Sequence, residues 1–181
     1  MEWKARGTDG ASSEGSRAGR FEFLGGREFH MSGLLPEENL GTFEDQRSNA
    51  PLIAAWVSRD DPVVKEFAAM ASRNAGGAGA QTSSDNAMKV VRACYEIMLL
   101  NEFIYKSPPY IMDPKVRLDE RLVQNVKYPR DVIRDKCGTC IDLAILQAAM
   151  WHTLGLKPYL AFIPGHCFPV VDIDGNLQAV E

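Results

Sequence analysis

The sequence has no excess of basic residues and no long apolar run. Its 181 residues include 20 Lys and Arg against 24 Asp and Glu, so the formal net charge is -4. Nucleic acids and anionic membranes select basic surfaces, and this charge balance argues against both as partners. No apolar run approaches the roughly 18 residues of a membrane span, and the charged first residues lack the apolar segment of a signal peptide. We therefore expect a cytoplasmic protein.

Cysteine and histidine are scarce, with 4 and 3 residues. Four cysteines are few for a disulfide framework in a chain long enough to bury a core. We expect reactive, metal-binding or simply buried thiols instead. With 45% hydrophobic and 24% charged residues, the composition is typical of a globular domain.

Composition divides the chain into three parts. Residues 1–19 consist mainly of Gly, Ser, Ala and charged residues, and we expect them to be disordered because they bury little apolar surface. Residues 20–50 are an N-terminal appendage, with a small hairpin over 20–32 and a polar connector. Residues 51–181 are expected to form the compact domain, which begins with an apolar strand or extended segment at 52–57.

Within this domain the pattern predicts helices followed by antiparallel strands, which is the α+β class. Asp60 or Asp61 caps the first helix, Gly155 ends the last one, and an irregular connection spans 110–128. The expected helices cover residues 62–74, 84–106, 129–136 and 140–154. The expected strands cover residues 159–163, 166–173 and 177–181, with a bend at Pro164-Gly165 and a hairpin turn at Asp174-Gly175.

Cys140 is the first candidate for chemistry. Thr139 and Asp142 form a capping-box pattern, which places Cys140 in the first turn of an apolar, buried helix. The partial positive charge of the helix end favours a thiolate there. A nucleophilic cysteine also needs an imidazole, and only His30, His152 and His166 are present.

Elimination favours His166. His152 lies twelve residues after Cys140 on the same helix, about 18 Å along its axis, and His30 belongs to the appendage. The helix from Cys140 climbs about 21 Å, and an extended chain from Tyr159 to His166 returns about 23 Å. We therefore expect His166 beside the helix start, next to Cys140.

A carboxylate should orient the imidazole. Asp172 and Asp174 lie about 20 and 26 Å along the strand from His166, so we interpret them as turn residues. A two-residue turn at Asp174-Gly175 pairs Asp172 with Leu177, and the same register brings Glu181 diagonally across from His166. Glu181 is the predicted orienting acid; alternatively, it is only the solvated last residue of the chain.

The segments GTCIDLA (138–144), LGLKP (154–158) and PGH (164–166), followed by a hairpin and an acid, resemble the transglutaminase-like superfamily of papain-type cysteine enzymes, especially its uncharacterised bacterial members. The resemblance covers about residues 50–181. It implies a papain/transglutaminase-like core, in which a helix carrying the nucleophile packs on an antiparallel sheet carrying the histidine and acid. Cys140, His166 and Glu181 match the three catalytic positions. The family often has Asp at the third position, and it usually adds sheet strands where this chain stops.

The implied reaction is acyl transfer on an amide, by a peptidase, amidase or transglutaminase, with no cofactor and no metal. The Cys140 backbone N–H and the Gln124 side-chain amide are candidate oxyanion donors. The substrate is open among a peptide, a protein and a small amide.

Three alternatives stay open. Cys137-Gly138-Thr139-Cys140 is a C-x-x-C at a helix start, as in thiol–disulfide oxidoreductases, although a charged helix rather than a buried strand precedes it. Cys137, Cys140, His166 and Cys167 are also potential zinc ligands, although neighbouring strand residues point to opposite faces. The third alternative is that the chain is a non-catalytic binding or scaffold module of the same fold.

Overall fold

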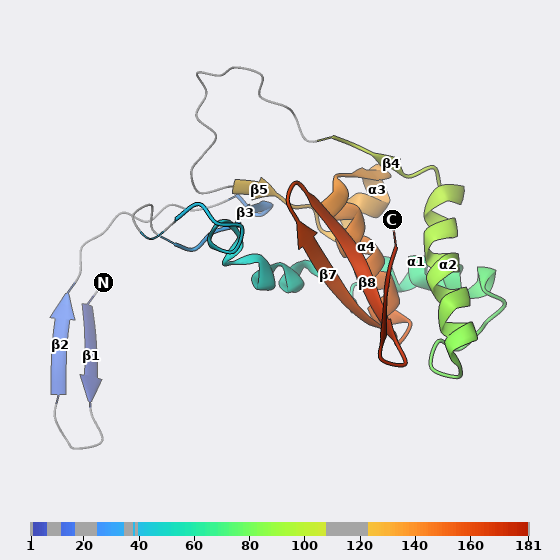
Figure 1. Ribbon diagram of the computed structural model, residues 1–181, viewed down its shortest axis with the longest axis horizontal. Helices are drawn as coiled ribbons and strands as arrows, with labels where there is room; N and C mark the ends of the chain where they lie inside the picture. The colour runs from blue at the N-terminus through green and yellow to red at the C-terminus, as the bar shows by residue number, and fades with distance from the viewer. Residues whose placement is uncertain are drawn as a thin grey trace.

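The computed structural model describes residues 2–6, 12–16, 25–34, 38, 40–107 and 123–180 (Figure 1). Its α-helices are α1 (Pro62–Asn74), α2 (Ser84–Leu100), α3 (Pro129–Asp135) and α4 (Cys140–Thr153), and its 3-10 helices are η1 (Asp45–Arg47) and η2 (Ala50–Trp56). Its strands are β1 (Glu2–Arg6), β2 (Ser12–Ser16), β3 (Glu28–His30), β4 (Ile104–Tyr105), β5 (Val123–Asn125), β6 (Cys137–Gly138), β7 (Lys157–Ile163), β8 (His166–Ile173) and β9 (Asn176–Ala179). The fold is α+β, as predicted.

Helix α4 is the centre of the fold. It is apolar on nearly all sides, and Ile145, Leu146, Met150 and Trp151 are fully buried. Helices α1, α2 and α3 contact it, and strands β7 and β8 cover it from another side (Figure 1). No described helix is long and apolar enough to cross a membrane.

Two apolar clusters surround α4 at different heights. Around its later turns, Leu146 and Met150 pack with helices α1 and α2 and with the far end of β8. Around its first turns, Ile141 and Ala144 pack with Ile53 of η2 and with Cys167 near the start of β8. The beginning of β8 therefore lies at the level of the helix start, as the length arithmetic predicts.

Strands β7, β8 and β9 form an antiparallel sheet in that order. The sequence analysis predicted that Pro164-Gly165 only bends the chain between two strands. In the structure it reverses the chain, so that Ile163 pairs with His166. Gly165 has a positive φ of 76°, which the second central residue of such a turn requires. The predicted turn at Asp174-Gly175 is confirmed, as is the pairing of Asp172 with Leu177.

The prediction of a strand at residues 52–57 is wrong, because the structure forms the 3-10 helix η2 there. Pro51 lies in its first turn, and the spacing of Ile53 and Trp56 suits a helix of three residues per turn. Only Ile53 of η2 is fully buried, while Leu52 is 60% exposed. The apolar run is therefore a surface turn that inserts one side chain into the core.

The helix predicted over 84–106 is shorter than expected. Helix α2 ends at Leu100, and Glu102 takes a positive φ of 58°. Ile104–Tyr105 then pairs in parallel with Cys137–Gly138. Local periodicity could not reveal this end, because the partner that draws the chain out of the helix is more than thirty residues away in sequence.

The N-terminal parts also differ from the predictions. Strand β3 pairs with the distant β5, and residues 20–24, the other half of the predicted local hairpin, lie outside the described residues. Strands β1 and β2 pair with each other within the segment predicted as disordered. Composition indicates whether a segment can bury apolar side chains in a core. A two-stranded hairpin pairs its backbone N–H and C=O groups without such a core, so composition did not reveal it. Most of the predicted irregular connection, residues 110–122, also lies outside the described residues.

Candidate active site

Cys140 is the first residue of α4, and its side chain is half-buried. The preceding Thr139 has the extended backbone of an N-cap residue. The Asp142 carboxylate accepts hydrogen bonds from the Thr139 backbone N–H at 2.9 Å, from the Thr139 hydroxyl at 3.0 Å and from the Lys127 backbone N–H at 2.8 Å. This carboxylate, itself buried, therefore fixes the segment that carries the thiol.

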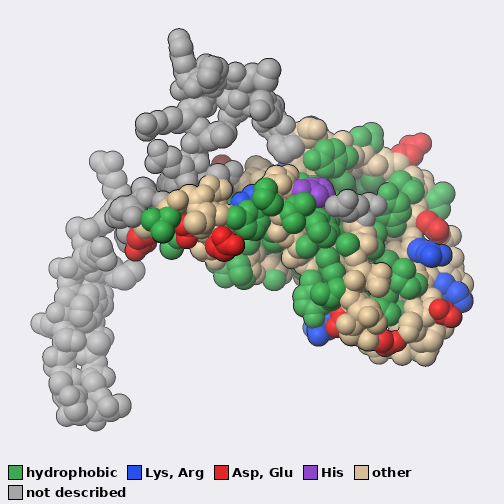
Figure 2. Space-filling model, in the orientation of Figure 1, with side chains coloured by type: hydrophobic (Ala, Val, Ile, Leu, Met, Phe, Trp, Pro, Cys, Tyr) green, Lys and Arg blue, Asp and Glu red, His purple; other side chains and the backbone are tan. Residues whose placement is uncertain are grey.

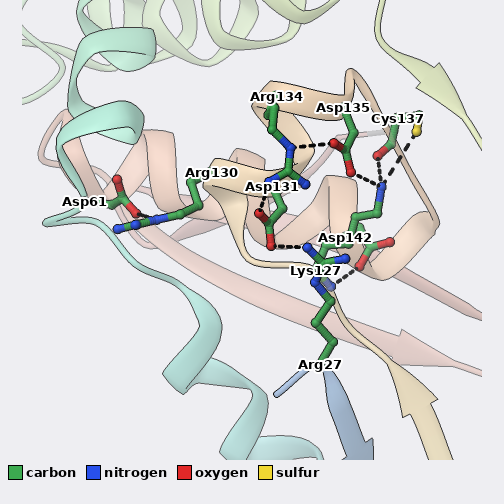
Figure 3. A network of polar contacts seen from close by, with 9 residues as sticks. All are labelled: Arg27, Asp61, Lys127, Arg130, Asp131, Arg134, Asp135, Cys137 and Asp142. Atoms are coloured by element: carbon green, nitrogen blue, oxygen red, sulfur yellow. Dashed lines mark hydrogen bonds and ion pairs between the residues drawn. The ribbon is translucent and has the colours of Figure 1, made fainter. Parts of the chain in front are cut away.

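A network of charged side chains extends this support (Figure 3). The Lys127 ammonium donates to Asp135 at 3.0 Å and to the Cys137 carbonyl at 3.1 Å, and its Nζ lies 3.7 Å from the Cys137 sulfur. Asp131 accepts from Arg27 at 2.8 Å and pairs with Arg134 at 3.0 Å. The network ties α3 to the loop that precedes Cys140.

Gly138 is required by the close approach of α4. A Cβ at this position would lie 2.7 Å from the Cβ of Asp142, closer than real side-chain contacts allow. The glycine also belongs to β6, where it pairs with Tyr105 of β4. The contact with Asp142 and the pairing with Tyr105 together fix the backbone at position 138, directly before α4.

Tyr105 is a site residue that the sequence analysis missed. Partial burial raises the pKa of its phenol, and the charge of the Cys140 thiolate and a hydrogen bond to it raise the pKa further. The phenol therefore lies close enough to the Cys140 thiol to act on it. The parallel pairing of β4 with β6 brings Tyr105 to the site, and no local sequence pattern reveals this pairing.

The four cysteines are all free thiols, but they differ in burial. Burial raises the pKa of Cys94 to about 12. Burial, together with the charge of nearby Cys140, raises the pKa of Cys167 to about 12 as well. Cys137 and Cys140 are only half-buried, so they are the thiols that solvent reaches.

His166 is the first residue of β8. Buried and half-buried side chains alternate along this strand, and Cys167, on the buried side, packs against the first turns of α4. The side chain of His166 belongs to the other face, where its ring lies 5.8 Å from that of Phe168. The pairing of His166 with Cys140 stays a prediction.

Glu181, the predicted orienting acid, lies outside the described residues. The register that leads to it holds as far as the structure describes it, because the Val180 N–H donates to the Pro169 carbonyl at 3.2 Å. Asp174 is a turn residue, as expected, and has a φ of 52°. Asp172 was also interpreted as a turn residue, but it lies in β8, from where its carboxylate accepts from the Gly175 N–H of the turn at 2.8 Å.

A family model described as a transglutaminase-like domain matches residues 79–180, which is more than half of the chain. The chain belongs to this family. No curated protein and no solved structure matches it. The matched part of this transglutaminase-like chain includes helices α2, α3 and α4 and strands β7, β8 and β9, so the family resemblance inferred from residues 138–166 is confirmed.

The remaining candidates of this transglutaminase-like domain lie elsewhere. Gln124 belongs to β5, and its side-chain amide donates to the neighbouring Asn125 carbonyl at 3.3 Å, so an oxyanion role for it stays a prediction. His152 lies at the far end of α4, where its Nε2 is 3.1 Å from Arg59. His30 belongs to β3 and pairs with Val123.

Metal-ligating side chains do not gather within the part of the chain that the structure describes. Among those residues, no group of three or more His, Cys, Asp or Glu could hold a metal ion. Two of the potential zinc ligands considered above lie on opposite faces of β8, because Cys167 faces α4 and the adjacent His166 belongs to the other face.

Proposed function

We propose that this transglutaminase-like domain is a cysteine-dependent enzyme that cleaves or transfers amide bonds, with Cys140 as nucleophile, His166 as acid and base, and Glu181 as the orienting acid. The observation that carries the proposal is the half-exposed Cys140 thiol in the first turn of the buried α4, with the start of β8 packed at the same level.

In the proposed reaction the Cys140 thiolate attacks the amide carbonyl carbon, and a C–S bond forms as the carbonyl π electrons move to oxygen. The tetrahedral intermediate collapses, the C–N bond breaks, and the imidazolium of His166 protonates the leaving amine. Water or a second amine then attacks the thioester, gives its proton to the imidazole, and releases an acid or a new amide. The Cys140 backbone N–H at the helix start is one oxyanion donor.

The test is the pH dependence of iodoacetamide alkylation, with each cysteine followed by peptide mass spectrometry. In the wild type we expect Cys140 to react fast below about pH 8, and Cys94 to be the unreactive internal reference. His166→Ala should remove the fast reaction of Cys140. His152→Ala is the matched control, because that imidazole lies at the other end of α4.

If Cys140 reacts like an ordinary thiol, or if both histidine variants react alike, the proposed pair does not exist. If the pair exists, deamidated or cleaved β-casein peptides detected by mass spectrometry mark hydrolysis, and incorporation of a fluorescent primary amine marks transfer.

A second candidate function rests on the Lys127 ammonium, which lies 3.7 Å from the Cys137 sulfur. A positive charge next to the first thiol of a C-x-x-C pattern suits thiol–disulfide exchange. There Cys137 attacks a substrate disulfide, Cys140 resolves the mixed disulfide, and the substrate leaves as two thiols. Cys137→Ser abolishes such exchange but leaves the proposed acyl transfer intact, so this variant separates the two functions.

A further inference from the structure

A groove of about 790 Å³ runs between η2 and strand β7. Ala54 of η2 forms one wall, Leu160 and Phe162 of β7 form the other, and Ala148 of α4 lies between them. The volume falls within the range of ligand-binding clefts, and most of the lining side chains are apolar. Hydrophobic side chains gather over η2 and β7 on the face of the molecule drawn in Figure 2. Figure 1 shows that β7, rather than β9, is the strand of the sheet nearest to η2.

The wall formed by β7 is an unpaired strand edge. The sheet order is β7, β8, β9, so the second edge of β7 has no strand partner among the described residues. Ile163 and His166 flank a two-residue turn and therefore form a hydrogen-bonded pair, and such pairs alternate along the strands. Leu160 and Phe162 fall in the other pairs, so their N–H and C=O groups point away from β8, toward the open edge.

Proline placement agrees with this register. Pro158 falls in the same set of positions as Leu160 and Phe162, where a missing N–H removes no hydrogen bond between β7 and β8. The free donors and acceptors of the edge therefore lie at Leu160 and Phe162. Such an edge is completed by the backbone of another extended chain, which presents donors and acceptors at the same spacing.

One wall of the groove reaches the apolar cluster that the candidate nucleophile contacts. Leu160 and Phe162 pack against the same apolar cluster as Cys140. Ala148 lies eight positions after Cys140 on α4, which is about 12 Å along the helix axis. An extended chain covers that distance in about four residues. A peptide that lies in the groove and continues toward the start of α4 therefore brings a nearby amide to the thiol.

We propose that this groove binds an extended segment of a protein substrate, which adds to the free edge of β7 as a further strand. The proposal rests on the proposed function, for which it names the substrate class: polypeptides several residues long rather than small amides. Backbone pairing at Leu160 and Phe162 supplies affinity without regard to sequence, and the apolar lining selects an apolar side chain.

Binding is tested without catalysis in the full chain carrying Cys140→Ala. The probe is β-casein, an unfolded protein, and N-acetylglutamine amide is the small-amide comparison. Amide hydrogen exchange is followed residue by residue by NMR. We expect casein to slow exchange at Leu160 and Phe162 and to change Tyr159 and Ala161 little, because their N–H groups already pair with β8. The small amide should slow none of them.

Two substitutions on η2 give a matched control. Ala54 lines the groove and the adjacent Ala55 does not, and both are exposed. Ala54→Trp should raise the dissociation constant for casein by at least about tenfold, since the indole fills the groove. Ala55→Trp should leave the constant unchanged.

The proposal is overturned if casein does not bind, if it binds without slowing exchange at Leu160 and Phe162, or if both tryptophan variants bind alike. It is overturned too if the small amide gives the same protection as casein. None of these outcomes bears on the proposed function, which Cys140 alkylation in the wild type and His166→Ala decides separately.

Discussion

Removal of the buried Asp142 carboxylate should lower the free energy of unfolding by an amount that follows from its hydrogen bonds. In Asp142→Ala, the backbone N–H groups of Thr139 and Lys127 and the Thr139 hydroxyl lose their acceptor. A hydrogen bond to a charged group contributes about 1.5–3 kcal/mol, but water reaches these half-buried donors and replaces part of it. We therefore expect a loss of about 3–5 kcal/mol, a large part of the roughly 5–15 kcal/mol that stabilises a domain.

The loss is measured by urea unfolding, with the fluorescence of the buried Trp151 as one probe of the core. A shift in midpoint at unchanged slope is converted to a free energy of unfolding. Asp85→Ala is the matched control, because Asp85 is an exposed aspartate in the first turn of α2. Its loss should be only about 0.3–1 kcal/mol, the usual interaction with a helix dipole. If the two variants lose equal stability, the carboxylate does not hold the start of α4.

Three further predictions concern the same region. Gly138→Ala should destabilise the fold by about 1–3 kcal/mol, since the new Cβ meets that of Asp142, whereas Gly26→Ala has open space and should be neutral in the same urea assay. Asp135→Asn tests pH dependence: Arg134 and Lys127 lower the pKa of Asp135, so its stabilisation is complete above the ordinary value of 3.8 and is lost as the pH falls through the lowered one. The difference between the urea midpoints of wild type and Asp135→Asn should therefore be constant above about pH 5 and should narrow as the pH falls below about 4, and a gap that widens in acid contradicts this. Tyr105→Phe should slow the alkylation of Cys140 by about two- to fivefold at neutral pH, because the thiol loses the neighbouring phenol, whose effect water screens at this half-exposed position; an unchanged rate would show that the phenol does not act on the thiol.

The elements that the sequence predicted well are those whose signals are local. Thr139 and Asp142 mark the start of α4, and Gly155, with a φ of 86°, follows its end. Asp174-Gly175 marks the turn from β8 to β9 and, with it, the register between them. Each of these features depends on residues within a few positions of one another, so neighbouring residue types were sufficient to find them.

The elements that the sequence missed depend on distant partners. Strand β3 pairs with β5 about a hundred positions later, and β4 leaves the predicted helix to pair with β6. Neither partner was visible in the local pattern, so Tyr105 was not considered for the site. The candidate nucleophile was therefore accessible from sequence, whereas the group beside it was not.

Burial, rather than sequence context, separates the thiols of this domain. Cys94 lies in the core between the helices, and Cys167 faces α4, so burial keeps both protonated. Cys140 is in contact with the same cluster as Cys167 but lies at the end of α4, where solvent and the Tyr105 phenol reach it. A thiol at that position keeps an apolar support on one side and meets solvent and the phenol on the other. Since a mobile thiol is a poorly placed nucleophile, this division of its surroundings suits the proposed acyl transfer at Cys140.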